Sequence, residues 1–247
     1  GRYNEFKEKA SVKYLIKDFE INAFLRLESR APSVFQRKYL SNGANYSTSN
    51  IKNQGVFQFG ANASYDFLGE KIKLLLFADV ATVSNPYLFD DTNWVNSTGN
   101  YNFYSFGVRS AFEFGVFNFN PTIVYSPNSI NYIPEVQVYG RIFVKGKLFK
   151  AKKLEAIIGL DLTYVSAYES RVYLPTMDTY NWSQTFSSSG KVLNLHAFLS
   201  LGISEFRFFV RYENIGYFWS DKTTQTIANY PISPTRLRIG FTWDFFN

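Results

Sequence analysis

The sequence predicts an all-β fold, an antiparallel up-and-down transmembrane β-barrel, and three observations lead to this prediction. The final segment alternates strictly, because Arg238, Gly240, Thr242 and Asp244 are small or charged while the residues between them are large and apolar. About eleven alternating segments follow one another along the chain. The connections between them are short and long in turn. Period-2 alternation gives a strand one apolar and one polar face, and this loop asymmetry is typical of outer-membrane barrels.

The composition agrees with strands that face two environments. Aromatic residues make up 19% of the 247 residues, with 26 Phe and 18 Tyr, while the mean hydropathy is only -0.17. Apolar and polar residues must therefore be interleaved. No run approaches the roughly 18 apolar residues that a membrane helix requires, and even the richest run, residues 74–81, contains Asp79. The absence of Cys excludes disulfides and thiolate metal sites.

The eleven strands are expected in a single β-barrel domain that covers residues 1–247. Each strand is assigned to a segment of about ten residues that alternates in character and lies between turn residues. In chain order, the expected strands are residues 9–16, 19–30, 54–67, 71–84, 102–114, 117–126, 134–147, 153–169, 191–202, 206–218 and 236–246.

From the second strand on, each strand has an apolar face. In the first half these faces consist of Ile21, Leu25 and Leu27, of Phe57, Phe59 and Tyr65, of Ile72, Leu74 and Leu76, of Phe106, Val108 and Phe112, and of Phe117, Phe119 and Ile123. In the second half they consist of Val136, Val138 and Ile142, of Leu154, Ile158 and Leu160, of Leu193, Leu195 and Leu199, and of Phe206, Phe208 and Val210. In the last strand, the residues expected to face lipid are Leu237, Ile239, Phe241, Trp243 and Phe245.

The connections follow a regular order. Short ones are expected at residues 17–18, 68–70, 115–116, 148–152 and 203–205, and long polar ones at 31–53, 85–100, 127–133, 171–190 and 219–234. Because every strand of a barrel turns back at a membrane face, this order predicts tight periplasmic turns and long outer loops.

The distribution of charge favours a membrane barrel over a soluble all-β fold. No charged side chain falls on the apolar faces, which lipid would require because Arg or Lys costs about 2–4 kcal/mol at the bilayer midplane. A soluble sandwich or lipocalin-like barrel produces the same period-2 pattern. Its polar face would meet water, however, and would carry more Lys and Glu than the Arg, Asn, Gly, Thr and Tyr found here.

The polar faces are expected to line a lumen. The charged lining candidates are Arg26, Glu28, Arg109, Glu113, Arg141, Lys145, Glu155, Asp161, Arg207, Arg211, Glu213, Arg236 and Arg238. Rings of such residues tune ion passage in channels, but the same side chains can instead pair across strands and brace the wall. Because the last strands are neighbours, Arg207, Arg211, Arg236 and Arg238 are expected to form a locally cationic wall that favours anionic solutes.

Strand parity predicts that more strands precede this chain. If the last strand ends in the periplasm, the strand at residues 9–16 begins outside, whereas bacterial barrels have an even number of strands with both termini periplasmic. Residues 1–8 are too few for a loop and a further strand, and they contain no signal peptide. We therefore expect the chain to be the C-terminal part of a larger even-stranded barrel.

The second half carries a series of short motifs that resembles a known family. These are Tyr139-Gly140-Arg141, Gly159-Leu160-Asp161, Arg211-Tyr212-Glu213-Asn214, and Tyr230-Pro231 followed by Arg236 and the aromatic last strand. Over about residues 134–247 they resemble the Putative porin family of Bacteroidetes outer membranes. The family's Pro-Gly-Arg before the last strand is here Pro234-Thr235-Arg236, and the chain ends in Asn247. The resemblance implies an outer-membrane barrel with porin activity.

No catalytic, metal or cofactor site is expected. The single histidine, His196, lies mid-strand on the polar face. At this position a hydrogen-bonding role is favoured over a catalytic role such as that of an acyl hydrolase histidine. Phosphate and calcium loops are absent from the sequence. The net charge of +6 is spread along the chain, which argues against nucleic-acid binding. The expected surroundings are the lipid and lipopolysaccharide of a bacterial outer membrane.

Two functions remain open at this stage. One is a porin for passive diffusion of small hydrophilic solutes. The other is a structural or accessory barrel of a larger outer-membrane assembly, with a filled lumen and with long loops that bind other outer-membrane proteins. Two features favour the second function. Bulky side chains occur on the polar faces, at Phe24, Leu75, Phe77, Phe143 and Phe209, and aromatic residues occur in the loops, at Tyr39, Tyr173, Tyr180 and Trp182.

Overall fold

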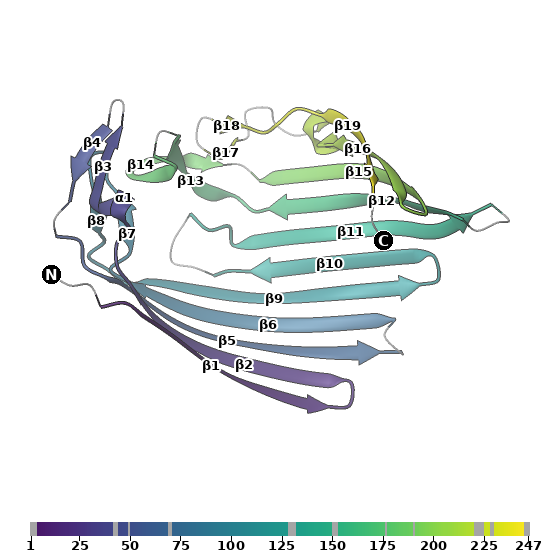
Figure 1. Cartoon of the computed structure of the whole chain (residues 1–247), viewed down its shortest axis with the longest axis horizontal. Coiled ribbons are helices and arrows are strands. Elements are labelled where there is room, and N and C mark those ends of the chain that lie inside the picture. The colour runs from purple at the N-terminus through teal and green to yellow at the C-terminus, as the bar shows by residue number, and fades with distance from the viewer. Residues whose placement is uncertain are drawn as a thin grey trace.

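The structure, a computed structural model, consists mainly of one curved antiparallel sheet (Figure 1). It describes residues 4–41, 44–48, 50–68, 71–127, 132–149, 153–175, 177–189, 191–219, 225–227 and 230–244. The sheet has eleven strands, which pair in chain order. They are β1 (Phe6–Ile16), β2 (Phe19–Arg30), β5 (Gln54–Phe67), β6 (Ile72–Ser84), β9 (Tyr101–Phe114), β10 (Phe117–Tyr125), β11 (Val136–Leu148), β12 (Leu154–Val165), β15 (Val192–Ile203), β16 (Phe206–Glu213) and β19 (Arg236–Trp243).

The pairing register sorts apolar residues onto one face of this sheet. One row across six strands, from β10 to β19, is Phe117, Val144, Ile158, Leu199, Val210 and Ile239. Residues along this row are exposed, with Ile158 59% and Ile239 62% accessible. By contrast, the buried apolar residues Ile51, Phe89, Val192 and Ile232 lie at or near the loop connections. In the described part of the chain, the apolar face is therefore not covered by protein.

Short turns join the strands at one end of the sheet, on the right in Figure 1. Among the described residues of these turns, the backbone is left-handed at Lys17, Leu68, Gly115, Phe149 and Ser204. Only Gly115, with φ +63°, adopts this conformation without a steric cost. The predicted asymmetry of short and long connections is thus reproduced.

The long connections lie mainly at the opposite end and contain small elements of their own (Figure 1). Four short strands form a second sheet in the order β13-β14-β7-β8, and two further pairs are β3 with β4 and β17 with β18. Their bounds are α1 Val34–Arg37, β3 Lys38–Ser41, β4 Ala44–Ser47, β7 Tyr87–Phe89, β8 Trp94–Asn96, β13 Tyr168–Leu174, β14 Thr179–Ser189, η1 Ile215–Phe218, β17 Gln225–Ile227 and β18 Tyr230–Pro231. In the described residues, neither helix is long and apolar enough to span a membrane.

Two predicted strands end earlier than the alternation indicates. Residues 153–169 were expected as one strand, but β12 ends at Val165, where Ser166 hydrogen-bonds Val136 through both backbone and side chain and closes the ladder. Residues 206–218 were also expected as one strand. There β16 ends at Glu213 because Asn214 adopts a left-handed backbone (φ 53°) that starts η1.

Candidate functional site

All thirteen charged lining candidates lie on one face of the large sheet. The register alternates strictly, so Arg26 on β2 shares a face with Gln58 on β5, and Arg141 on β11 shares it with Asp161 on β12. The aromatic and aliphatic residues of the last strand, Leu237, Ile239, Phe241 and Trp243, occupy the opposite face. Phe245 lies outside the described residues. That the polar face lines a lumen stays a prediction.

A ladder of alternating charges crosses the polar face from β11 to β19. Arg141 donates to both carboxylate oxygens of Asp161, at 2.6 Å from Nε and 3.1 Å from Nη2. Arg211 approaches the same carboxylate at 3.2 Å and Glu213 at 3.6 Å. Arg238 contacts Glu213 at 2.8 Å. The ladder links three arginines through two carboxylates, so each acid neutralises parts of two cations.

A second cluster lies on β2. Glu28, only 7% exposed, accepts hydrogen bonds from Arg26 and Arg30, which stand two residues away on either side and share its face of the strand. Further along the sheet, Lys145 and Glu155 approach to 3.5 Å, and both are substantially exposed. Ion pairs that brace the wall are therefore present in both halves of the sheet, on its polar face.

The expected cationic wall is only partly neutralised. Arg211 and Arg238 belong to the charge ladder, whereas Arg207 and Arg236 form no ion pair with any carboxylate in the described residues. On the strands β11 to β19, the cationic lining candidates Arg141, Lys145, Arg207, Arg211, Arg236 and Arg238 outnumber the carboxylates Glu155, Asp161 and Glu213. The local excess of positive charge is thus carried mainly by arginines near the end of the chain.

Phenylalanine rings on the polar face lie over glycines of the neighbouring strand. At Gly60, Gly107 and Gly240 an added Cβ would overlap the ring of the directly paired phenylalanine. At Gly159 it would overlap the start of the Phe143 side chain. The pairs are Phe24 with Gly60, Phe77 with Gly107, Phe143 with Gly159, and Phe209 with Gly240. The missing side chains let the bulky residues pack against the wall.

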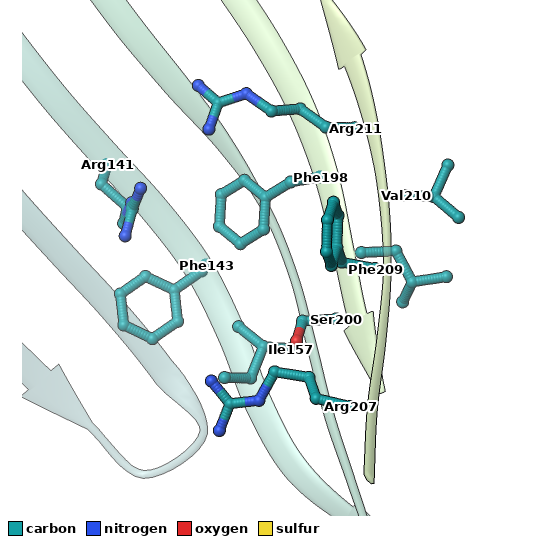
Figure 2. Close-up of a pocket in the computed structure, with 10 residues that line it drawn as sticks. Arg141, Phe143, Ile157, Phe198, Ser200, Arg207, Phe209, Val210 and Arg211 are labelled. Atoms are coloured by element: carbon teal, nitrogen blue, oxygen red, sulfur yellow. The ribbon is translucent and has the colours of Figure 1, made fainter. Parts of the chain in front are cut away.

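A pocket of about 330 Å³ opens on the polar face over β11, β12, β15 and β16 (Figure 2). Its lining includes Phe143, Phe198 and Phe209 together with Ile157 and Ser200. Its charged residues are three arginines, with Arg211 and Arg207 at opposite ends of the pocket on β16 and Arg141 on β11, on the other side of β12 and β15. Alternation in the sequence predicts that Arg141, Arg207 and Arg211 share this face, but it does not predict the pocket.

The charge ladder leads to a stability prediction. Asp161→Asn removes the charge that holds Arg141 and Arg211, so we expect the free energy of unfolding to fall by about 1–2 kcal/mol. Urea unfolding of the purified protein in phospholipid vesicles, followed by tryptophan fluorescence, measures the change. The matched control is Glu155→Gln, whose exposed and longer ion pair should contribute less than about 0.5 kcal/mol. Equal losses in the two variants would contradict the bracing role of the ladder.

His196 and Asn214 form the junction that leads to the last strand. The backbone amide of Asn214 donates to His196 Nδ1 at 2.9 Å, and the Asn214 side chain donates to the carbonyl oxygen of Ser233. The Thr235 hydroxyl donates a hydrogen bond to the Asn214 carbonyl oxygen at 3.2 Å. The Arg-Tyr-Glu-Asn motif and the segment before the last strand are therefore tied together. Within the described residues, no cluster of three acidic or histidine side chains could hold a metal ion.

The loop aromatics pack mainly on one another. The rings of Tyr173 and Tyr180 lie 5.4 Å apart, and Trp182 meets Tyr132 edge-on at 4.9 Å. Tyr173 also donates to Asp178 at 2.6 Å, a hydrogen bond that raises the pKa of the phenol. The side chain of Tyr39 lies outside the described part of the structure.

Solved outer-membrane receptors have a similar fold. The FrpB iron transporter from Neisseria meningitidis (F3-3 variant) matches with a TM-score of 0.66 at 9% identity, over 96% of this chain and 39% of that one. The siderophore receptor PirA from Acinetobacter baumannii gives 0.68 at 9%, over 96% and 41%. The ferripyoverdine receptor of the outer membrane of Pseudomonas aeruginosa gives 0.63 at 12%, over 96% and 32%. The chain thus spans well under half the length of these structures.

The family comparison agrees with the fold. No curated protein matches the sequence, but the family model described as Putative porin matches residues 1–247, including the first half, where the sequence motifs carried no resemblance. Together with the receptor-like fold, this match indicates an outer-membrane β-barrel and a location in a bacterial outer membrane. The chain belongs to the Putative porin family.

Proposed function

We propose that the protein is a porin through which small hydrophilic solutes diffuse passively across the outer membrane. The observation that carries the proposal is the sorting of side chains across the large sheet. Every charged lining candidate shares one face, while exposed aliphatic and aromatic residues such as Ile158 and Ile239 form the other. In a closed barrel this arrangement gives a lipid-facing exterior and a polar, charged interior.

The packing of the phenylalanines supports an open lumen over a filled one. From the sequence alone, the bulky side chains of Phe24, Phe77 and Phe209 on the polar face favour a plugged barrel. The three rings lie over glycines on the adjacent strands instead. Side chains that pack against the wall obstruct a lumen less than side chains that project into it.

Conductance separates this proposal from the accessory barrel. The purified protein is reconstituted in a planar lipid bilayer, and single-channel current is measured in KCl. Stable open steps are the expected result. A barrel that resists unfolding in vesicles but passes no current in the bilayer would overturn the proposal and would favour a structural subunit whose loops bind other outer-membrane proteins.

Ion selectivity should depend on the arginines that lack an acidic partner. Arg207→Glu reverses a charge on the polar face without leaving a described carboxylate unpaired, so we expect a clear shift of the reversal potential toward cation preference in a KCl gradient. Lys17→Glu, in the exposed turn between β1 and β2, is the control with the same change in net charge. If the two variants shift the reversal potential equally, the cationic wall does not set selectivity.

A further inference from the structure

The pocket on the polar face is produced by the row pattern of the strands. In one row Phe143, Gly159 and Phe198 are direct neighbours across β11, β12 and β15. In the next row Ile157, Ser200 and Phe209 are neighbours across β12, β15 and β16. Each row has a small residue between two large ones. Phe143 and Phe198 flank the glycine in the first row, and Ile157 and Phe209 flank the serine in the second. The depression is therefore built into the register of well-formed strands.

The charged groups around this depression are all cationic. Arg141, Arg207 and Arg211 line it, and its lining contains no carboxylate. Arg141 and Arg211 are held by Asp161, and the Arg141 guanidinium lies 5.1 Å from the centre of the Phe198 ring. Arg207 forms no ion pair with a described residue. Its guanidinium is therefore free to bind an incoming anion, and the two held arginines add positive potential nearby.

We propose that this pocket is a subsite for a small monoanion with a planar apolar body, such as an aromatic carboxylate. The carboxylate would pair with Arg207, and the ring would pack among Phe143, Phe198 and Phe209 (Figure 2). A volume of about 330 Å³ is at the small end of ligand pockets, which suits a single ring. A neutral sugar fits less well, because Ser200 is the only hydroxyl side chain of the described lining and no carboxylate accepts from sugar hydroxyls.

The inference rests on the proposed function, since solutes reach the pocket only if the polar face lines a lumen that is open on at least one side of the membrane. The test is therefore made on binding as well as on current. Purified protein in phospholipid nanodiscs is titrated with benzoate, and binding is followed by ligand-observed NMR. Benzyl alcohol supplies the ring without the charge, and acetate supplies the charge without the ring. We expect benzoate to bind at least about tenfold more tightly than either, a difference of about 1.4 kcal/mol.

Two arginine variants locate the site. Arg207→Gln should weaken benzoate binding about tenfold, whereas Arg236→Gln, which removes a cation from the same face outside the pocket lining, should leave it unchanged. Equal losses in both variants, or equal binding of acetate and benzoate, would mean that net charge alone attracts the anion and would overturn the proposal.

Current and binding together distinguish the two ways of failing. A channel that conducts but shows no benzoate binding retains the porin function and loses the subsite. A silent barrel that still binds benzoate through Arg207 loses the porin function and retains the subsite. A conducting channel with Arg207-dependent binding should also show a benzoate-dependent decrease in open current that is absent in Arg207→Gln.

Discussion

Ile158→Arg is expected to lower the free energy of unfolding in phospholipid vesicles by about 2–4 kcal/mol. Ile158 stands near the middle of β12, on the apolar face, between Val144 and Leu199. Its side chain is 59% exposed, on the face that an outer-membrane barrel turns toward the bilayer. A guanidinium at this depth would have to leave water without an acidic partner. Urea unfolding followed by tryptophan fluorescence gives the difference from the unchanged protein.

The adjacent residue provides a matched control. Ile157 has the same side chain on the same strand but lies on the polar face, where it lines the pocket. Ile157→Arg should therefore cost about 1 kcal/mol or less and should alter conductance instead. If both variants lose the same stability, the two faces of β12 do not meet different environments, and the membrane orientation inferred from the alternation is wrong.

The sheet could be predicted from sequence because its determinants are local. Alternation such as Asp161 and Leu162, or Arg238 and Ile239, assigns each side chain to a face without knowledge of its partner. Short connections force the strands that they join to pair as antiparallel neighbours, and the regular order of short and long connections indicates an up-and-down sheet in which the strand order follows the chain. The fold class and the shared face of the charged residues both follow from these two features.

Structure within the loops could not be predicted in the same way. Strand β14 pairs in parallel with β7 through Asn181 and Phe89, residues that are far apart in sequence and belong to segments expected as plain polar loops. Short strands of this kind have too few residues to show a period. Likewise, the end of β16 depends on the left-handed backbone of Asn214 and its hydrogen bonds to Ser233 and Thr235, which are contacts between distant segments.

The candidate site was predictable as a set of charges but not as a pocket. Alternation assigns Arg141 and Asp161 to one face, but only the register shows that they are direct partners. The same holds for Phe143 and Gly159. From the sequence alone, Phe143 predicts a bulky side chain in the lumen, whereas Gly159 predicts no contact. Their pairing shows that a Cβ added at the glycine would overlap the start of the phenylalanine side chain, a contact that neither residue reveals by itself.

Gly159→Ala is expected to lower the free energy of unfolding by about 1–3 kcal/mol. A Cβ at this position would overlap the carbonyl oxygen of Ile142 and the Cα and Cβ of Phe143, which belong to the paired strand. Because two of these atoms are backbone, rotation of a side chain cannot relieve the overlap. The backbone hydrogen bonds between β11 and β12 must therefore open locally, and Phe143, which lines the pocket, shifts with them. Urea unfolding in vesicles measures the loss.

Gly146→Ala is the matched control for this substitution. Gly146 lies on β11, paired with Ala156 on β12, and a Cβ there would meet no atom within 4 Å. Alanine restricts the unfolded chain more than glycine does, so this variant should be neutral or more stable by up to about 1 kcal/mol. If Gly159→Ala were as well tolerated as Gly146→Ala, the strands would have to separate easily at this point. The close packing of Phe143 against Gly159 would then not be what shapes the pocket.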